Sequence, residues 1–222
     1  MFTPSDITAP VFFTASQEQV LQTARKTLED VTGMVTVHRT DGTAFTGSCF
    51  FFSNKMYVIT CFHVIANAVD GGIALNFPAH GNTTFPATVV GIDEQKDLAM
   101  LVLTGREAET HNLNFIKISS ESLRAHIVTF CGGCGVTGFH FSNGIMESSK
   151  IALRSVITNI TDHGTSGGPC CGIYYNNLIG VVCRNFGSAH HRTELVPALL
   201  VLDFIQALHR QYPQQVPDAE LV

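Results

Sequence analysis

The chain has 222 residues, enough for one large domain or two small lobes with a buried core. Its composition, 45% hydrophobic and 14% charged, excludes an intrinsically disordered protein. The net charge of −5 argues against broad contact with nucleic-acid phosphates. No apolar run reaches the roughly 18 residues of a transmembrane helix. We therefore expect a globular protein with no nucleic-acid partner and no membrane span.

The N-terminus, MFTPSDITAPVFFTAS, has no basic start followed by an apolar core, so no signal peptide is predicted. In that context the seven cysteines are expected as reduced thiols, most of them in the core. The expected location is intracellular, in the cytoplasm or the nucleus. A segment cut from a longer precursor is the alternative.

The first predicted element is a helix. Ser16 and Gln19 have the spacing of a capping box. The apolar residues that follow share one helical face: Val20, Leu21, Ala24 and Leu28. Gly33 ends this region, so residues 1–33 are expected as an N-terminal segment with one helix.

From Met34 onward the chain consists of short β-prone runs separated by turn residues. The runs are MVTVHRT, GSCFFFS, MYVITCF, GIALNFP, TTFPATVVGI and DLAMLVL, then NFIKIS, AHIVTF, GVTGFHF, IALRSVI and LIGVVCRNF. Many short strands with few helices between them favour barrels or sandwiches. We expect two β-lobes, over 34–110 and 111–196, linked near THNLN at 110–114.

The C-terminal stretch VPALLVLDFIQALHRQY predicts a helix packed on the second lobe. Its apolar face consists of Leu199, Leu200, Phe204, Ile205 and Leu208. The tail PQQVPDAELV is polar and interrupted by proline, so it is expected to be loose. Helix and tail make up the last segment, 197–222.

A serine between glycines, in DHGTSGGPCCG, is the candidate nucleophile. The hydroxyl of Ser166 becomes nucleophilic only if a base takes its proton and a third group orients that base. His63 follows the apolar run MYVITCF and opens a helix-like turn. Asp97 lies in a turn directly before the apolar run LAMLVL. Each of the three, taken alone, also fits an ordinary turn residue.

The glycines around the serine allow backbone conformations with positive φ and a close approach of substrate. The loop Gly164-Thr165-Ser166 is therefore the candidate oxyanion hole, with the amides of Gly164 and Ser166 as donors.

Three blocks resemble the trypsin-like serine peptidases of the chymotrypsin fold, with the texture of HtrA/Deg-type protease domains. They are TGSCFFFSNKMYVITCFHVIANA around His63, PATVVGIDEQKDLAMLVL around Asp97 and ITDHGTSGGPCCGIYYNNLIGVVC around Ser166. The resemblance spans roughly residues 31–205, most of the chain.

This resemblance implies an all-β protein with peripheral N-terminal and C-terminal helices. Its two antiparallel β-barrels, chymotrypsin-like, would hold the active site between them. It further implies a serine endopeptidase that cleaves peptide bonds through an acyl-enzyme on Ser166, with His63 as base and Asp97 orienting it. The partner would be a protein or peptide substrate, no cofactor is expected, and a homo-oligomer is compatible with the sequence.

The chain departs from secreted trypsin-like zymogens at Thr165, where those proteins have an acid. It also has no start like I-V-G-G, so activation by N-terminal cleavage is not expected. The PDZ module that usually follows a Deg-type domain is not expected either, because few residues follow Ser166.

The resemblance places the substrate pocket on two short segments. They are Ile160, Thr161 and Asp162 on one side, and Val182, Cys183 and Arg184 on the other. Because no acid stands at Ile160, a preference for Lys or Arg is not favoured, and a small or medium apolar P1 residue is predicted. Asp162 or Arg184 would change this preference by reaching into the pocket.

Two other interpretations of the motifs are less favoured. G-x-S-x-G also fits the nucleophile elbow of an α/β-hydrolase, but the acid and base that would follow, Asp203 and His209, share one predicted helix. Cys131-Gly-Gly-Cys134 has the spacing of half a zinc site. Its completion would come from His140, Cys170, Cys171 or Cys183. With no second pair of this kind, a glycine-rich loop is the preferred interpretation, and no metal is predicted.

Two functional alternatives stay open. One is a catalytically silent binding module with the protease fold, although no member of the triad is missing. The other is a viral-type protease that processes a polyprotein.

Overall fold

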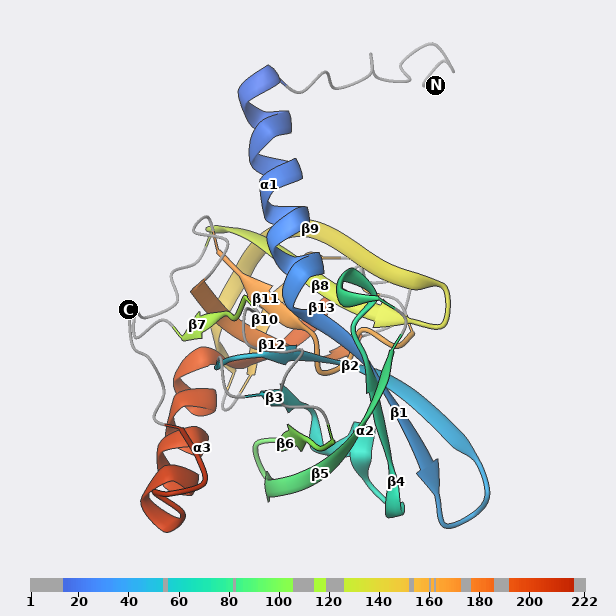
Figure 1. The fold of residues 1–222 in the computed structure, drawn as a ribbon. Coiled ribbons are helices and arrows are strands. Elements are labelled where there is room, and N and C mark those ends of the chain that lie inside the picture. The colour runs from blue at the N-terminus through green and yellow to red at the C-terminus, as the bar shows by residue number, and fades with distance from the viewer. Residues whose placement is uncertain are drawn as a thin grey trace, which may run out of the picture.

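The computed structural model describes residues 14–53, 56–81, 83–105, 114–118, 126–151, 154–159, 161, 163–172, 177–185 and 192–217. Two β-barrels form the body, with one helix before them in the chain and one after them (Figure 1). The predicted architecture of two antiparallel barrels with terminal helices is confirmed.

Helix α1 (Ala15–Val31) begins two residues earlier than predicted. Its capping box consists of Thr14 and Gln17, and the Thr14 backbone N–H donates to the Gln17 side chain over 2.9 Å. Ser16 lies inside the first turn of the helix. The pairs Thr14/Gln17 and Ser16/Gln19 both fit the motif, but only Thr14/Gln17 forms the cap. The N-terminal half of α1 projects from the barrels, and Val20 is 37% exposed (Figure 1). Only the C-terminal half is anchored, by Ala24, Leu28 and Val31.

The first barrel is closed by six antiparallel strands in the order β1-β2-β3-β6-β5-β4. They are β1 (Thr32–Arg39), β2 (Ala44–Phe51), β3 (Tyr57–Thr60), β4 (Ala68–Asn76), β5 (Thr84–Asp93) and β6 (Leu98–Leu103). A short helix, α2 (Phe62–Ile65), follows β3, and a 3-10 turn, η2 (Pro78–His80), follows β4. Side chains at alternate positions, such as Val35 and Val37, fill the interior.

The second barrel contains β8 (Val128–Gly135), β9 (Gly138–Ile151), β10 (Arg154–Ile157), β11 (Pro169–Cys171), β12 (Asn177–Asn185) and β13 (Thr193–Pro197). The order is β11-β8-β9-β10-β13-β12, and β12 pairs back with β11 to close it. The short strand β7 (Lys117–Ile118) adds to β12 in parallel. Of the predicted link at 110–114, residues 110–113 lie outside the described residues.

The run Cys131–Gly135 belongs to strand β8, so the predicted glycine-rich loop at this point is wrong. The glycines serve close packing instead. A Cβ on Gly133 would lie 2.5 Å from the Thr165 side chain, and one on Gly132 would lie 3.0 Å from the Thr32 hydroxyl. Strand β8 therefore passes directly behind the serine turn.

Helix α3 (Ala198–Gln211) packs on the barrels through a stripe of buried residues. They are Ala198, Val201, Leu202, Phe204, Ile205 and Leu208. Leu199, predicted on this face, is 43% exposed, since the apolar stripe runs through Ala198 and Val201. Within the described part of the chain, no helix is both long and apolar enough to cross a membrane.

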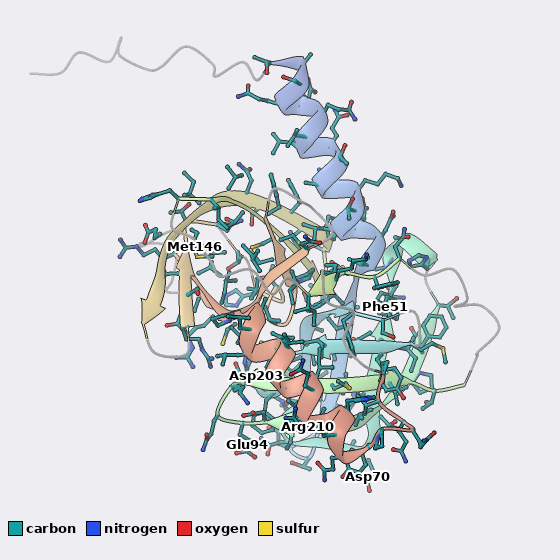
Figure 2. All side chains as sticks on the ribbon, turned by 90° about the vertical axis from the view of Figure 1, so that its left-hand side faces the viewer. Phe51, Asp70, Glu94, Met146, Asp203 and Arg210 are labelled. Atoms are coloured by element: carbon teal, nitrogen blue, oxygen red, sulfur yellow. The ribbon has the colours of Figure 1, made fainter. Side chains whose placement is uncertain are left out.

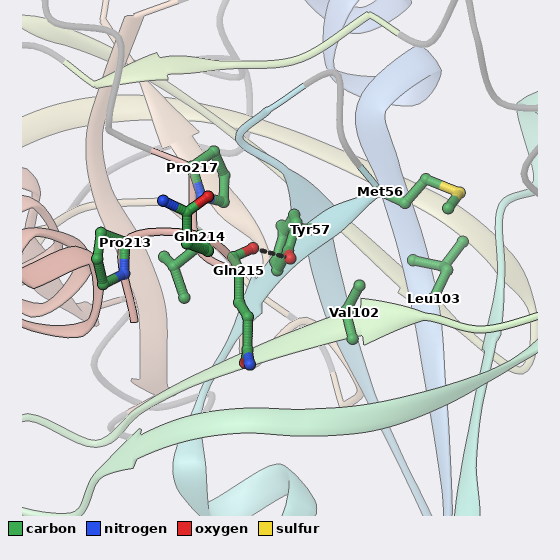
Figure 3. A pocket seen from close by; sticks show the side chains of 9 residues that line it. Met56, Tyr57, Val102, Leu103, Pro213, Gln214, Gln215 and Pro217 are labelled. Carbon is green, nitrogen blue, oxygen red and sulfur yellow. Dashed lines mark hydrogen bonds between the residues drawn. The ribbon is translucent and has the colours of Figure 1, made fainter. Parts of the chain in front are cut away.

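The C-terminal segment 213–217 folds back onto β3 and β6 (Figure 3). Tyr57 donates a hydrogen bond to the Gln215 carbonyl, and Val216 is buried. The expectation of a loose tail is therefore wrong for these residues, while 218–222 lie outside the description. A cavity of about 350 Å³ lies beneath the segment, and its lining includes neither His63 nor Ser166.

Candidate active site

His63 lies in the short helix α2, directly after strand β3. Its backbone is held from two sides. The N–H donates to Asp97 Oδ1 over 2.9 Å, and the carbonyl accepts from Arg39 Nη2 over 3.3 Å. The Arg39 guanidinium also lies 4.3 Å from the centre of the Phe45 ring. The imidazole, 40% exposed, therefore projects from a fixed backbone.

Asp97 ends the turn between β5 and β6, and its φ of 59° places it in the left-handed region. Such a conformation in a residue other than glycine is uncommon and clusters at functional sites. The turn brings Asp97 Oδ2 to 2.8 Å from His63 Nδ1. The structure thus brings together the predicted acid and base.

The ionisation of Asp97 follows from its surroundings. Burial acts to raise the pKa of Asp97, but hydrogen bonds from the His63 ring, the Cys183 thiol and the His63 backbone outweigh it. The net effect lowers the pKa below its ordinary value, so the carboxylate is ionised at neutral pH. An ionised Oδ2 favours the proton on Nδ1, which leaves the Nε2 lone pair available.

Cys183, on β12, contacts both halves of the site. Its thiol donates to Asp97 Oδ2 over 2.9 Å, and its carbonyl accepts from Ser166 Oγ over 2.9 Å. The resemblance placed Cys183 in the substrate pocket. The structure shows that its thiol is hydrogen-bonded to the Asp97 carboxylate. Nothing in the sequence pattern distinguishes this cysteine from an ordinary core thiol.

Ser166 lies in the turn before β11, and residues of both barrels form hydrogen bonds with that turn. The Ser166 carbonyl accepts from Ser48 N over 2.7 Å, and Gly167 N donates to the Val182 carbonyl over 2.7 Å. The Ser166 hydroxyl bonds to Cys183, and no hydrogen bond joins it to His63.

Two backbone amides of the predicted oxyanion loop have no hydrogen-bond acceptor among the described residues. Gly164 has a φ of 94°, and within the described residues neither its amide nor that of Ser166 donates a hydrogen bond. Ser48 is fully buried, and its side chain holds the carbonyl of Gly164 in place. Its hydroxyl donates to the Gly164 carbonyl over 2.6 Å and accepts from Cys134 N over 2.8 Å. Ser48 is not predictable from the sequence, since a serine in a strand carries no signal of this role.

A family model of the trypsin-like peptidase domain matches residues 47–181, more than half of the chain. The chain belongs to the trypsin-like peptidases. This confirms the family, and with it the serine-type peptidase class, that the three sequence blocks predicted.

The fold of this peptidase is similar to that of a serine endoprotease from Yersinia pestis, with a TM-score of 0.73. The match covers 86% of this chain and 66% of that one, just under two thirds, at 21% identity. At that identity the likeness shows a shared fold alone. Sequence comparison found no curated relative.

The pocket residues predicted for the peptidase have varied surroundings. The Thr161 hydroxyl lies 2.9 Å from that of Thr193, and Val182 is buried in the second barrel. Arg184 is exposed. Ile160 and Asp162 lie outside the described residues, so the predicted P1 preference stays a prediction.

The structure removes the α/β-hydrolase alternative. Asp203 is exposed on the outer side of α3, and His209 Nδ1 lies 2.8 Å from the Val216 carbonyl (Figure 2). Neither contacts Ser166, and the sheets are antiparallel barrels.

The Cys131–Cys134 pair does not form half a zinc site. The two residues are three apart on strand β8, so their side chains lie on opposite faces. Cys131 packs in the core of the second barrel, whereas the Cys134 thiol donates to the Thr32 carbonyl. All seven cysteines of the peptidase are free and buried.

Gly167 is required by the geometry of the serine turn. Its φ is 90°, and a Cβ there would lie 2.1 Å from the Ser48 carbonyl oxygen. We expect Gly167→Ala to lower the free energy of unfolding by about 3 kcal/mol or more, because it adds a backbone clash to backbone strain. Urea unfolding measures this.

Gly42→Ala is the matched control, because Gly42 also has positive φ (81°) but nothing lies within 4 Å of its Cβ position. Strain alone predicts a loss of about 1–2 kcal/mol there. Equal losses in the two variants would contradict the tight packing of the serine turn.

Proposed function

We propose that this chain is a serine endopeptidase that forms an acyl-enzyme on Ser166, with His63 as base and Asp97 as the group that orients it. The observation that carries the proposal is the hydrogen bond between Asp97 Oδ2 and His63 Nδ1, in a site whose serine turn both barrels hold. Family membership supports the same reaction class.

In the proposed reaction, Ser166 rotates about χ1 from the Cys183 carbonyl toward His63 Nε2. As Oγ attacks the substrate carbonyl, Nε2 accepts the hydroxyl proton and Asp97 stabilises the imidazolium. The negative charge on the substrate oxygen is stabilised by the amides of Gly164 and Ser166. His63 then protonates the leaving amine, and water releases the acyl group by the same steps in reverse.

The Ser166–Cys183 bond also favours a second candidate, the silent binding module, because the observed hydroxyl does not contact the base. Catalytic hydrogen bonds in unliganded enzymes often form only with substrate. The hydrogen bond from Ser166 to Cys183 is therefore compatible with an active enzyme. A measurement of peptidase activity decides between the enzyme and the silent module.

A peptide library read by mass spectrometry tests the proposal. The wild type is expected to produce new peptide termini that Ser166→Ala does not produce, with small or medium apolar residues enriched at P1. A folded wild-type protein that yields no more termini than Ser166→Ala would support the silent module instead.

Ser48 offers a test of the proposed oxyanion loop. Ser48→Ala removes the hydroxyl that joins Gly164 of the loop to Cys134 of β8. We expect kcat to fall about 10- to 100-fold with little change in KM, because the loop amides lose their alignment with the transition state. Steady-state kinetics on a peptide found in the library measures both constants.

Ser155→Ala is the control for this variant. Ser155 is also a fully buried serine, but its hydroxyl has no hydrogen-bond partner in the described structure. Its replacement is expected to leave kcat and KM within about twofold of the wild type. Equal effects of the two substitutions would show that Ser48 has only a packing role.

A further inference from the structure

Asp97 and three neighbouring side chains bring metal-binding atoms together. They are the thiols of Cys61 and Cys183, the imidazole of His63 and the Asp97 carboxylate, with donor atoms all within 4.8 Å of one another. Among the described residues this is the one group of three or more such side chains. Three ligands come from the first barrel, and Cys183 comes from the second.

Two hydrogen bonds of this group converge on one oxygen of Asp97. Asp97 Oδ2 lies 2.8 Å from His63 Nδ1 and 2.9 Å from the Cys183 thiol. The Cys61 thiol, fully buried, donates to the Val182 carbonyl over 3.3 Å and also contacts Cys183. Protons that converge on one carboxylate in this way occupy a position that a cation could take.

The chemistry of the four donors selects the cation. Two thiolates, an imidazole and a carboxylate are ligands typical of tetrahedral Zn²⁺, with bonds of about 2.0–2.3 Å that separate neighbouring ligand atoms by about 3.3–3.8 Å. A pair at the 4.8 Å limit has to close by about 1 Å, and the two hydrogen-bonded pairs have to open by about 0.5–0.9 Å. Side-chain rotation supplies such shifts. The exposed face of His63 gives the ion a path inward.

We propose that Cys61, His63, Asp97 and Cys183 form an inhibitory site for Zn²⁺ and related thiophilic cations. Binding releases the two thiol protons to solvent. His63 binds the ion through the Nδ1 lone pair, so its proton moves to Nε2. Nε2, the nitrogen that accepts the Ser166 proton in the proposed reaction, then has no lone pair for it. Inhibition in this form rests on the proposed function, whereas binding itself does not.

The test uses two readouts on protein kept reduced with a phosphine. Cd²⁺ binding is followed by the ultraviolet charge-transfer absorption of cadmium thiolates, which needs no activity. The rate of fluorophosphonate labelling is followed with added Zn²⁺ and again after EDTA. The variants are Cys61→Ala, which removes one ligand, and Cys171→Ala, which removes a buried thiol outside the group.

The wild type and Cys171→Ala are expected to show a saturable cadmium-thiolate band and labelling that Zn²⁺ blocks and EDTA restores. Cys61→Ala is expected to keep its labelling rate without metal and to bind at least about tenfold more weakly, since even the partners of ligands are worth about 10- to 100-fold. No band in the wild type, or equal affinities in the two variants, would overturn the site. A wild type that shows the band but never labels would refute the proposed function and leave the metal site standing.

Discussion

Replacement of Ser166 by alanine is expected to lower kcat by about 10⁶-fold. The reason is that Ser166 Oγ is the atom that forms the proposed acyl-enzyme, and alanine has no hydroxyl to take its place. Binding of substrate and the oxyanion amides remain, so a residual rate of about 10³- to 10⁴-fold above the uncatalysed reaction is expected.

Single-turnover hydrolysis of a fluorogenic peptide measures this loss, with KM or the peptide Kd as the internal reference. Because the Ser166 hydroxyl contributes one hydrogen bond at a partly buried position, the urea midpoint of Ser166→Ala should stay close to that of the wild type. A variant that is folded and retains more than about 1% of wild-type kcat would contradict the role of Ser166 as nucleophile.

Asp97→Asn is expected to lower kcat about 10⁴-fold. Its amide oxygen can still accept from the His63 backbone, as Asp97 Oδ1 does now. Its amide nitrogen replaces Oδ2, however, and donates where a carboxylate accepts from His63 Nδ1 and Cys183. The imidazole proton then moves to Nε2, and Ser166 loses its base. Kinetics on the same peptide, with ring tautomers followed by nitrogen NMR, checks both parts.

Asp93→Asn is the matched control for this substitution. Asp93 lies at the other end of the same turn, and its carboxylate bonds to the backbone and the side chain of Lys96. We expect a loss of less than about tenfold, because such a change alters stability by a few tenths to about 1 kcal/mol without touching the imidazole. A comparable loss in both variants would mean that the turn, and not the Asp97 carboxylate, is responsible.

Short β-prone runs between turn residues predicted barrels or sandwiches. The resemblance to trypsin-like peptidases then selected two antiparallel barrels. The pairing of His63 with Asp97 followed from the resemblance of the three sequence blocks to trypsin-like peptidases, and the barrel explains why the two meet. Each stands at the edge of an apolar strand, and β3 and β6 are neighbours in the barrel, so the two edges meet.

The residues that complete the site were not predictable in the same way. Ser48, Arg39 and Cys183 act through contacts between segments far apart in the chain, and their own surroundings in the sequence resemble ordinary strand residues. The tail at 213–217 was misjudged for a related reason. The segment is polar in composition, but it is held by one buried apolar side chain, Val216, and by the Gln215 carbonyl, which accepts a hydrogen bond from Tyr57.

The central claim is that Ser166 is the nucleophile of a catalytic triad with His63 and Asp97. Covalent labelling tests it most directly. Wild-type protein is treated with a fluorophosphonate, digested, and mapped by tandem mass spectrometry, with His63→Ala and Asp93→Asn treated in parallel. We expect one phosphonyl adduct on Ser166 in the wild type and Asp93→Asn, and labelling slower by several orders of magnitude in His63→Ala. A folded wild-type protein without an adduct, or with the adduct on another residue, would contradict it.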